Sequence, residues 1–394
     1  MELQNNIKMR IGIEAQRLFR AHKHGMDRVA LELIRNLQKI DKQNEYFIFV
    51  KPDIDRNILP EVKNFNIVEI SGGIYPIWEQ FKLPKIAEAY KCDILHCTSN
   101  TAPIRTNVSL VTTLHDVIFK EMSILNLLTS DASWYQKIGN LYRRFIVGKV
   151  VKRSKKLITV SNFEKSNIQK VLNKKKLQIE TVYNGVHESF TNKISKERKK
   201  IISKKYQLPS DFILHIGNTD PRKNTKRVLL SFYDYLNSYK SDLKLVIVGI
   251  KLNTLNAFLK ELDLVKELQE HVILTGYVAD EDLPVIFNLS SLFLFPSLRE
   301  GFGIPVIEAM ASGVPVITSN TSSMPEVAGD AASIVNPTDQ KEITEAIHKI
   351  LSNTAYKERL IKKGLERYKE FSWKNAAEKV LDLYNQLYLT QKTI

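Results

Sequence analysis

The sequence from Ser297 to Pro315 reads Ser-Leu-Arg-Glu-Gly-Phe-Gly-Ile-Pro-Val-Ile-Glu-Ala-Met-Ala-Ser-Gly-Val-Pro. It follows the apolar run Leu292 to Phe295, which predicts a strand, and it opens a segment of helical composition. Glu300 would then lie in a turn and Glu308 two turns into a helix. This layout predicts two carboxylates and several backbone N–H groups at the carboxyl end of a strand, where open α/β sheets bind ligands. Carboxylates in such a position can bind sugar or ribose hydroxyls.

Short apolar runs alternate with helix-like segments along the chain, which predicts an α/β fold with largely parallel sheets. At 394 residues the chain is long enough for two domains. The alternation restarts at the strand-like run Phe212 to Ile216, after the charged segment Asn192 to Lys205. We therefore expect one domain over residues 1–195, a second over residues 205–372, and a last helix over about 373–394.

A second motif combines glycine, proline and charge. The sequence from Gly217 to Asn224, Gly-Asn-Thr-Asp-Pro-Arg-Lys-Asn, lies between a predicted strand and a predicted helix. Two cations at the amino end of a helix are suited to a pyrophosphate, because their charges and the helix dipole add there. Arg222 and Lys223 are therefore candidate phosphate ligands, and a solvated turn is the alternative.

Further candidates lie in the first half of the chain. His115 follows the strand-like run Leu110 to Leu114, and a histidine at a strand end can bind a hydroxyl or assist a proton transfer. From the residues alone, a structural histidine is the favoured alternative for His115, and both roles stay open for His96. Gly25 lies between the first strand and the first helix, where a glycine lets the backbone approach a phosphate, although one glycine is not specific by itself.

Together these motifs closely resemble glycosyltransferase family 4, the retaining glycosyltransferases with the GT-B fold of two facing Rossmann-like domains. Residues 300–305 and 308–315 match the Glu-x7-Glu motif of that family, and members with mannosyl-transferring activity match the Pro-Arg-Lys-Asn loop best. The resemblance covers nearly the whole chain and is weakest from about Asp53 to Lys91. It implies that the last helix crosses back onto the first domain, and that no metal or other cofactor is needed.

The resemblance also implies roles for particular residues. The donor diphosphate would be bound by Lys223 and Arg222, although many members carry arginine where this chain has Asn218. That departure leaves the second diphosphate cation in doubt. The other implied roles are Glu308 at the ribose, Glu300 and the amides of Phe302 and Gly303 at the sugar, Tyr277 and Val278 at the base, Gly25 at the diphosphate, and His115 near the sugar or acceptor. His115 and Glu300 are the predicted catalytic residues.

We expect a hexose to pass from a nucleotide-sugar to a saccharide acceptor, on a lipid carrier in surface polysaccharide synthesis. The Pro-Arg-Lys-Asn loop makes GDP-mannose the first choice of donor and a UDP-hexose the second. The alternatives are a GT-B phosphorylase, a sugar-nucleotide epimerase, and an inactive basic protein that binds lipid or nucleic acid. Intact Glu300, Glu308 and Lys223 argue against an inactive protein, and we expect no nucleic-acid partner.

Charge and hydropathy bear on the location of the protein. The formal charge is +15, and the acid-free stretch from Arg143 to Lys156 carries much of it. As a helix this stretch would form a basic amphipathic surface suited to anionic lipid, and a solvated basic face is the alternative. No apolar run approaches the roughly 20 residues of a membrane-spanning helix, and no signal-peptide pattern occurs. We expect a cytoplasmic protein, with reduced thiols at Cys92 and Cys97, and no metal at Asp53-Ile54-Asp55.

Overall fold

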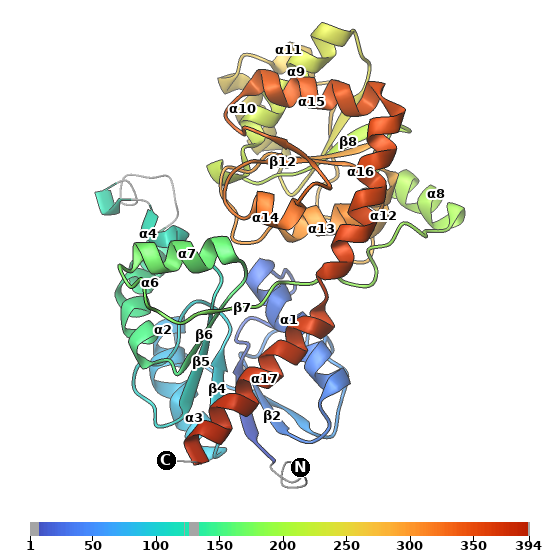
Figure 1. Ribbon diagram of the computed structural model, residues 1–394. Coiled ribbons are helices and arrows are strands. Elements are labelled where there is room, and N and C mark those ends of the chain that lie inside the picture. The colour runs from blue at the N-terminus through green and yellow to red at the C-terminus, as the bar shows by residue number, and fades with distance from the viewer. Residues whose placement is uncertain (1–7, 122, 126–133, 393–394) are drawn as a thin grey trace. The chain divides into compact units, whose positions relative to one another are not determined.

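The computed structural model describes residues 8–121, 123–125 and 134–392 (Figure 1). The chain forms two compact units, one up to Asn184 together with the chain from Trp373 onward, the other from Gly185 to Ser372. The expected boundary lay later, at residue 195. The segment before it belongs to the second unit because the ring of Phe190 packs 5.7 Å from that of Phe287, and Asn288 Nδ2 donates to the Thr191 carbonyl.

The first unit is built on a parallel seven-stranded sheet with the strand order β3-β2-β1-β4-β5-β6-β7. Strand β2 has the sequence Glu-Tyr-Phe-Ile-Phe-Val and is buried on both faces, as strands of parallel sheets are. The strand order reverses between β1 and β4, which makes their carboxyl ends the expected ligand position. The strands are β1 Arg10–Glu14, β2 Glu45–Val50, β3 Phe65–Glu69, β4 Ile94–Cys97, β5 Ser109–Leu114, β6 Lys156–Thr159 and β7 Glu180–Thr181.

Helices cover both faces of this sheet. Leu95 and Cys97 of β4 pack in one core with side chains of α3, α6 and the π-helix η1. His96, between them, points to the other face because side chains alternate along a strand, and there it meets α17. The helices are α1 Gly25–Ile40, α2 Tyr75–Ile77, η1 Trp78–Lys82, α3 Leu83–Ala89, α4 Ile118–Glu121, α6 Trp134–Arg153, α7 Asn162–Val171 and α17 Trp373–Lys392.

The second unit repeats this design with a parallel six-stranded sheet of order β10-β9-β8-β11-β12-β13. Its order reverses between β8 and β11, so the loops that follow these two strands lie side by side. The strands are β8 Phe212–Ile216, β9 Lys244–Val248, β10 Val272–Leu274, β11 Leu292–Phe295, β12 Val316–Ser319 and β13 Ser333–Val335. The helices and 3-10 turns are α8 Lys196–Lys205, η2 Pro221–Lys223, α9 Thr225–Tyr239, α10 Leu252–Glu261, α11 Val265–Leu268, α12 Leu283–Leu289, α13 Ile304–Ala311, α14 Met324–Ala328, α15 Gln340–Ser352, α16 Thr354–Arg367 and η3 Tyr368–Glu370.

The last helix, α17, packs on the first unit, as the resemblance implied (Figure 1). His96 helps to hold it there. Its Nδ1 lies 2.6 Å from the Tyr384 hydroxyl of α17 and its Nε2 lies 2.8 Å from Thr113 Oγ1. Because both ring nitrogens are hydrogen-bonded within the first unit and the residue is fully buried, His96 is a structural histidine.

This buried histidine predicts a pH dependence of stability. Burial lowers the pKa of His96 from 6.5 to about 3, so at pH 5 the folded protein keeps the ring neutral while the unfolded chain protonates it. The contribution of the buried neutral ring to the free energy of unfolding is therefore present above pH 6.5 and is lost as the pH falls below 6.5. Between pH 7 and pH 5 the loss is about 2 kcal/mol. Urea unfolding at the two pH values should therefore show a drop for wild type that exceeds the drop for His96→Gln by that amount, and equal drops would contradict the prediction.

Candidate active site

The glycine-proline motif forms the loop between β8 and α9 in the second unit. Asn224 adopts a left-handed conformation with φ of 59° before α9. Its side-chain amide donates to the carbonyls of Pro296 at 2.9 Å and Pro337 at 2.7 Å. The backbone N–H of Leu298 donates to the Arg222 carbonyl at 2.8 Å. These bonds fix the loop that bears Arg222 and Lys223 against the loop that bears Glu300.

The two cations of this loop differ in their partners. Arg222 Nε lies 3.0 Å from both carboxylate oxygens of Asp220. Burial alone would raise the pKa of Asp220, but the Arg222 hydrogen bonds outweigh it and the net pKa is lowered. Asn218, where many family members have arginine, accepts the Asp220 N–H at 2.7 Å and shapes the turn. Asn218 therefore supplies no charge, and the charge of Arg222 is already compensated by Asp220.

Lys223 has a different partner. Its Nζ donates to Glu300 Oε1 at 2.7 Å and lies 4.9 Å from the centre of the Phe295 ring. The side chains of Lys223 and Glu300 are only 23% and 14% exposed, so this ion pair is partly shielded from water. The structure thus brings together the residue predicted at the diphosphate and the residue predicted at the sugar. A ligand with a phosphate next to a hydroxyl-rich ring matches this pair chemically.

The loop from Glu300 to Gly303 leads into α13. Ser322 Oγ accepts the Glu300 N–H at 3.1 Å, and Ser323 Oγ donates to the carbonyls of Glu300 and Phe302. Glu308 is buried in the second turn of α13. The first turn of a helix has backbone N–H groups without intrahelical partners, which favours an anion in front of it. This end of α13, at Ile304, lies four residues after Glu300.

Gly303 is required by its backbone. Its φ is 99°, and a Cβ at this position would lie 2.2 Å from Met324 Cε. Gly303→Ala should therefore lower the stability of the second unit by about 1–2 kcal/mol, measured by thermal unfolding. Gly276→Ala is the matched control, because Gly276 has φ of 67° but a Cβ there would meet nothing within 4 Å. A loss no greater for Gly303→Ala than for the control would show that the contact with Met324 is unimportant.

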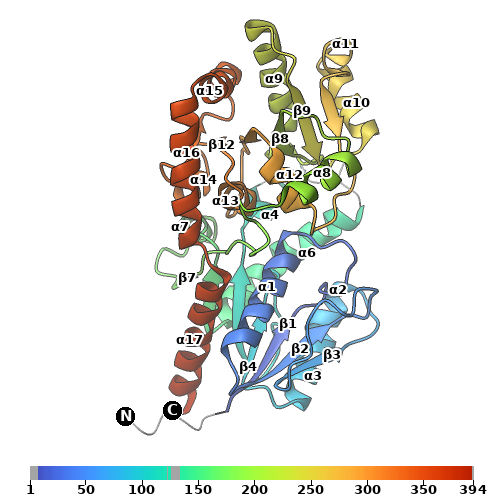
Figure 2. The same ribbon diagram turned by 90° about the vertical axis from the view of Figure 1, so that its right-hand side faces the viewer.

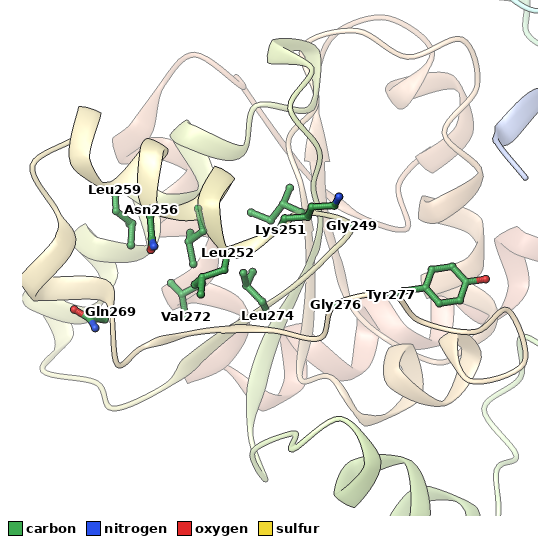
Figure 3. A pocket seen from close by; sticks show the side chains of 12 residues that line it. Gly249, Lys251, Leu252, Asn256, Leu259, Gln269, Val272, Leu274, Gly276 and Tyr277 are labelled. Atoms are coloured by element: carbon green, nitrogen blue, oxygen red, sulfur yellow. The ribbon is translucent and has the colours of Figure 1, made fainter. Parts of the chain in front are cut away.

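A pocket of about 850 Å³ lies beside the predicted base segment (Figure 3). Gly276 and the exposed Tyr277 line one end of it, whereas Val278 is buried outside its lining. Besides Tyr277, its polar side chains are Lys251, Asn256 and Gln269, and the rest of the lining is apolar or glycine. Gly249 joins the pocket to residues 217–224, which we call the phosphate loop after its predicted role, since a Cβ at Gly249 would lie 2.5 Å from the Gly217 carbonyl oxygen. The pocket therefore lies between the predicted base segment at Tyr277 and the phosphate loop.

The first unit carries His115 and Gly25. His115 lies at the end of β5, buried, with Nε2 2.7 Å from the Thr98 carbonyl, which can only accept. Nε2 therefore carries the hydrogen of the neutral ring and Nδ1 is the acceptor nitrogen. Burial lowers the pKa of His115, which keeps the ring neutral at pH 7. Gly25 begins α1, and a Cβ there would meet no atom within 4 Å, so packing does not require glycine at this position.

The remaining sequence predictions have mixed outcomes. Cys92 and Cys97 are free and buried, which confirms the expectation of two thiols. Asp55 pairs with Lys23 instead of forming a joint site with Asp53. In the described part of the chain, no group of three or more His, Cys, Asp or Glu side chains could hold a metal ion.

The basic stretch from Arg143 to Lys156 is helical up to Arg153, and its last residue begins β6. Residues 143–153 form the second half of α6, where Ile146, Val147, Val150 and Val151 are buried in the core of the first unit. Three of its cations contact their own unit: Arg143 lies over the Phe119 ring, Arg144 donates to Asn140, and Arg153 donates to the Thr106 carbonyl. Lys149 and Lys152 are exposed. The stretch is thus helical, with an apolar side in the core and Lys149 and Lys152 on the exposed side, and its binding to anionic lipid stays a prediction.

Several residues of the site had no sequence prediction. Asp220, Ser322 and Ser323 hold the phosphate and Glu300 loops, and Lys251 lines the pocket. The polar run from Ser319 to Ser323 begins at the last residue of β12, which is the neighbour of β11 in the sheet. A correct prediction of the strand order would therefore have placed this run beside the Glu300 loop. Glu14 ends β1 beneath Thr98, and burial raises its pKa to about 7. The sequence did not indicate Glu14, because a single acidic residue at the end of an apolar run is not a specific pattern.

Comparison with known proteins identifies the class. Residues 24–190 match the family model "Glycosyltransferase Family 4", and residues 195–367 match "Glycosyl transferases group 1". The solved structure of Anabaena Alr3699/HepE in complex with UDP-glucose has a TM-score of 0.72 with this chain at 16% identity, covering 96% of this chain and 100% of that one. The fold is thus GT-B, and the protein is a glycosyltransferase. With both domains matched in order along one chain, it belongs to glycosyltransferase family 4.

Two curated relatives extend this result. The chain is 28% identical to O-antigen chain mannosyltransferase B of Escherichia coli, over 92% of this chain and 96% of that protein. It is 31% identical to the serotype-specific mannosyltransferase WbdA of Escherichia coli over 49% of this chain. That match spans only 24% of WbdA. The likeness to bacterial mannosyltransferases therefore covers nearly the full length in the first case and a part of a longer protein in the second.

Proposed function

We propose that this protein is a retaining mannosyltransferase that transfers mannose from GDP-mannose to a saccharide acceptor on a lipid carrier, in bacterial surface polysaccharide synthesis. The observation that carries the proposal is the Lys223–Glu300 ion pair of 2.7 Å, between the phosphate loop and the start of α13. The names of the curated relatives support mannose as the transferred sugar. A UDP-hexose is the second candidate donor, since HepE binds UDP-glucose.

In this proposal the second unit binds the donor. Lys223 and the first turn of α13 would stabilise charge that builds on the leaving diphosphate, as preorganised cations and dipoles do. Glu300 and the backbone amides of Phe302 and Gly303 would bind the sugar, and Glu308 would bind the ribose. The pocket that Tyr277 lines would receive the base. Arg222 would supplement Lys223 once the ligand competes with Asp220.

We propose front-face transfer, because the sequence of the first domain contains no acidic motif that would indicate a covalent nucleophile. The departing phosphate oxygen would take the proton of the acceptor hydroxyl on the same face. His115, neutral with Nδ1 as its acceptor nitrogen, would act near the sugar or the acceptor. Fixed protein charges would replace a metal ion, so we propose transfer without a metal or other cofactor.

The donor proposal is tested by thermal shift with GDP, UDP and ADP, each with its matching hexose derivative. A ligand at 100 times its Kd stabilises a protein by about 2.7 kcal/mol. GDP and GDP-mannose should raise the unfolding temperature, and the other nucleotides should not. A shift with UDP ligands alone would overturn GDP-mannose in favour of a UDP-hexose.

The reaction proposal is tested with GDP-mannose and a panel of soluble mannosides. The expected product has an α-linkage, which the one-bond coupling at C1 of the new residue reports by NMR. A β-linked product would overturn retention. A new sugar-nucleotide from GDP-mannose alone would instead indicate an epimerase, and mannose 1-phosphate formed on adding inorganic phosphate would indicate a phosphorylase.

A further inference from the structure

The chain between β4 and β5 begins with residues 98–104, which we call the 98–104 loop, and this loop holds His115 at two points. The Thr98 carbonyl lies 2.7 Å from Nε2 of the ring, and Asn100 Oδ1 accepts the His115 N–H at 2.6 Å. Asn100 adopts a left-handed conformation with φ of 67°, and its own N–H donates to the Thr113 carbonyl at 3.1 Å. The position of the loop therefore sets how the His115 ring lies.

Two neighbouring residues of η1 hold the other half of this loop. Glu79 Oε1 accepts a hydrogen bond from the Thr101 hydroxyl. Gln80 Nε2 donates to the Ala102 carbonyl at 2.9 Å, and Gln80 Oε1 accepts the Ile104 N–H at 3.0 Å. The Gln80 amide thus uses both a donor and an acceptor on the loop, a combination that neither a carboxylate nor an apolar side chain offers.

Two tyrosines complete the hydrogen bonds of Glu79. The Tyr75 hydroxyl donates to Glu79 Oε1 at 2.7 Å, and the hydroxyl of Tyr142 on α6 donates to Oε2. Both views of the ribbon place α2, which leads into η1, beside α6 (Figures 1 and 2). Glu79 is fully buried and also accepts from Thr101 and from Gln80. Because four donors hold it, the Glu79 carboxylate keeps one position and fixes the loop that it binds through Thr101.

The π-helical turn explains how two consecutive residues can both face the loop. The Leu83 N–H donates to the Trp78 carbonyl five residues back, instead of four as in an α-helix. Neighbouring side chains of an α-helix point about 100° apart, and the extra residue in this turn reduces that angle for Glu79 and Gln80. Trp78 anchors the turn, because it is fully buried and its Nε1 donates to the Ile70 carbonyl at 3.0 Å. Such turns are frequent at functional sites.

We propose that Glu79 and Gln80 are positioning residues of the transfer reaction: through the 98–104 loop they hold His115 in the tautomer that leaves Nδ1 as the acceptor nitrogen. In this form Nδ1 can accept a hydrogen bond from a substrate hydroxyl. The other tautomer would offer an N–H there and would set two acceptors, Nε2 and the Thr98 carbonyl, against each other. The inference rests on the proposed function for the part that His115 has in transfer, whereas the state of the ring is measured without substrate.

The ring-nitrogen NMR shifts of protein labelled with ¹⁵N-histidine report the tautomer directly. The signals of His115 are those that His115→Asn removes. Wild type should show one neutral tautomer, with the hydrogen on Nε2. Gln80→Met keeps an unbranched side chain and removes both bonds to the loop, so both tautomers should become populated and the two nitrogen shifts should move towards each other. An unchanged single tautomer in folded Gln80→Met would overturn the proposal.

A milder pair of variants decides the question if Gln80→Met does not fold. Thr101→Val removes the hydroxyl that binds Glu79 and keeps the shape of the side chain, whereas Thr101→Ser keeps the hydroxyl. The tautomer should be mixed in the first variant and single in the second. Gln38→Met is the matched control, because buried Gln38 in the last turn of α1 donates to the Pro60 carbonyl at 3.1 Å. A mixed tautomer in this control or in Thr101→Ser would contradict the proposal.

Transfer assays separate this inference from the proposed function. Gln80→Met and Thr101→Val should lower kcat for transfer to a soluble mannoside at least about tenfold, while KM for GDP-mannose stays near wild type because the proposed donor residues lie in the second unit. Thr101→Ser should keep the wild-type rate. A mixed tautomer with unchanged kcat would overturn the positioning role. If wild type itself transfers no mannose from GDP-mannose, the proposed function fails, and the NMR comparison still decides whether Glu79 and Gln80 set the ring of His115.

Discussion

Replacing Glu300 with Gln is expected to lower the rate of transfer by about 10²–10³-fold while GDP affinity stays nearly unchanged. Free GDP has no hexose, so it cannot report a contact that Glu300 makes with the transferred sugar. The substitution keeps the shape of the side chain and removes its charge. It also releases Lys223, which lies 2.7 Å from Glu300 in the structure. GDP binding should therefore be unchanged or slightly tighter, in calorimetry paired with single-turnover rates on GDP-mannose.

Two further variants test the specificity of this result. Glu308→Gln should weaken both GDP binding and turnover, because the ribose is common to the nucleotide and the sugar-nucleotide. Glu345→Gln, at an exposed position that pairs with Lys341 on α15, should change neither. Equal losses of GDP affinity in the Glu300 and Glu308 variants would contradict the division of roles between the two carboxylates.

The frame of the site could be predicted because it depends on local pattern. The apolar runs Phe212 to Ile216 and Leu292 to Phe295 correspond to strands β8 and β11 without a shift. Buried parallel strands are short continuous apolar runs, and each is followed by a polar loop at the same edge of its sheet. The positions of Glu300 and of the phosphate loop at the switch point follow from that pattern.

The partners within the site could not be predicted in the same way. Lys223 and Glu300 are 77 residues apart in the sequence. Neither motif indicates that these two side chains form an ion pair. Asp220 lies inside the phosphate motif, yet its pairing with Arg222 depends on the fold of η2. Side-chain pairing follows from how the loops pack, which a motif does not specify.

The basic stretch illustrates the same limit for charge. Its sequence is equally basic throughout, but Arg153 is directed to the Thr106 carbonyl while Lys149 lies over the exposed Phe145 ring. Which cations face solvent depends on which side of α6 is buried.

Replacing Lys223 with Ala is expected to weaken GDP binding by about 1.5–3 kcal/mol, or about 10–150-fold. Arg222 cannot compensate fully, since Asp220 already holds its guanidinium at 3.0 Å. Asn218 cannot compensate at all, because it is uncharged and its Oδ1 accepts a backbone N–H of the turn. In the proposed donor site Lys223 would therefore be the main side-chain charge for the diphosphate. Calorimetry with GDP at one fixed ionic strength measures the loss.

Lys226→Ala is the matched control, because Lys226 lies three residues further along the chain but pairs with Glu261 on the exposed surface. Its GDP affinity should match wild type. The ion pair with Glu300 adds a second comparison: in the Glu300→Gln background Lys223 is already released, so Lys223→Ala should cost slightly more there than in wild type, by about 0.5 kcal/mol, which matches the slightly tighter GDP binding of Glu300→Gln alone. Equal costs in both backgrounds would mean that Glu300 does not compete with the diphosphate for Lys223. Unchanged GDP affinity in Lys223→Ala would remove this lysine from the donor site, because a charge-assisted bond to the diphosphate cannot be lost without a measurable change in binding.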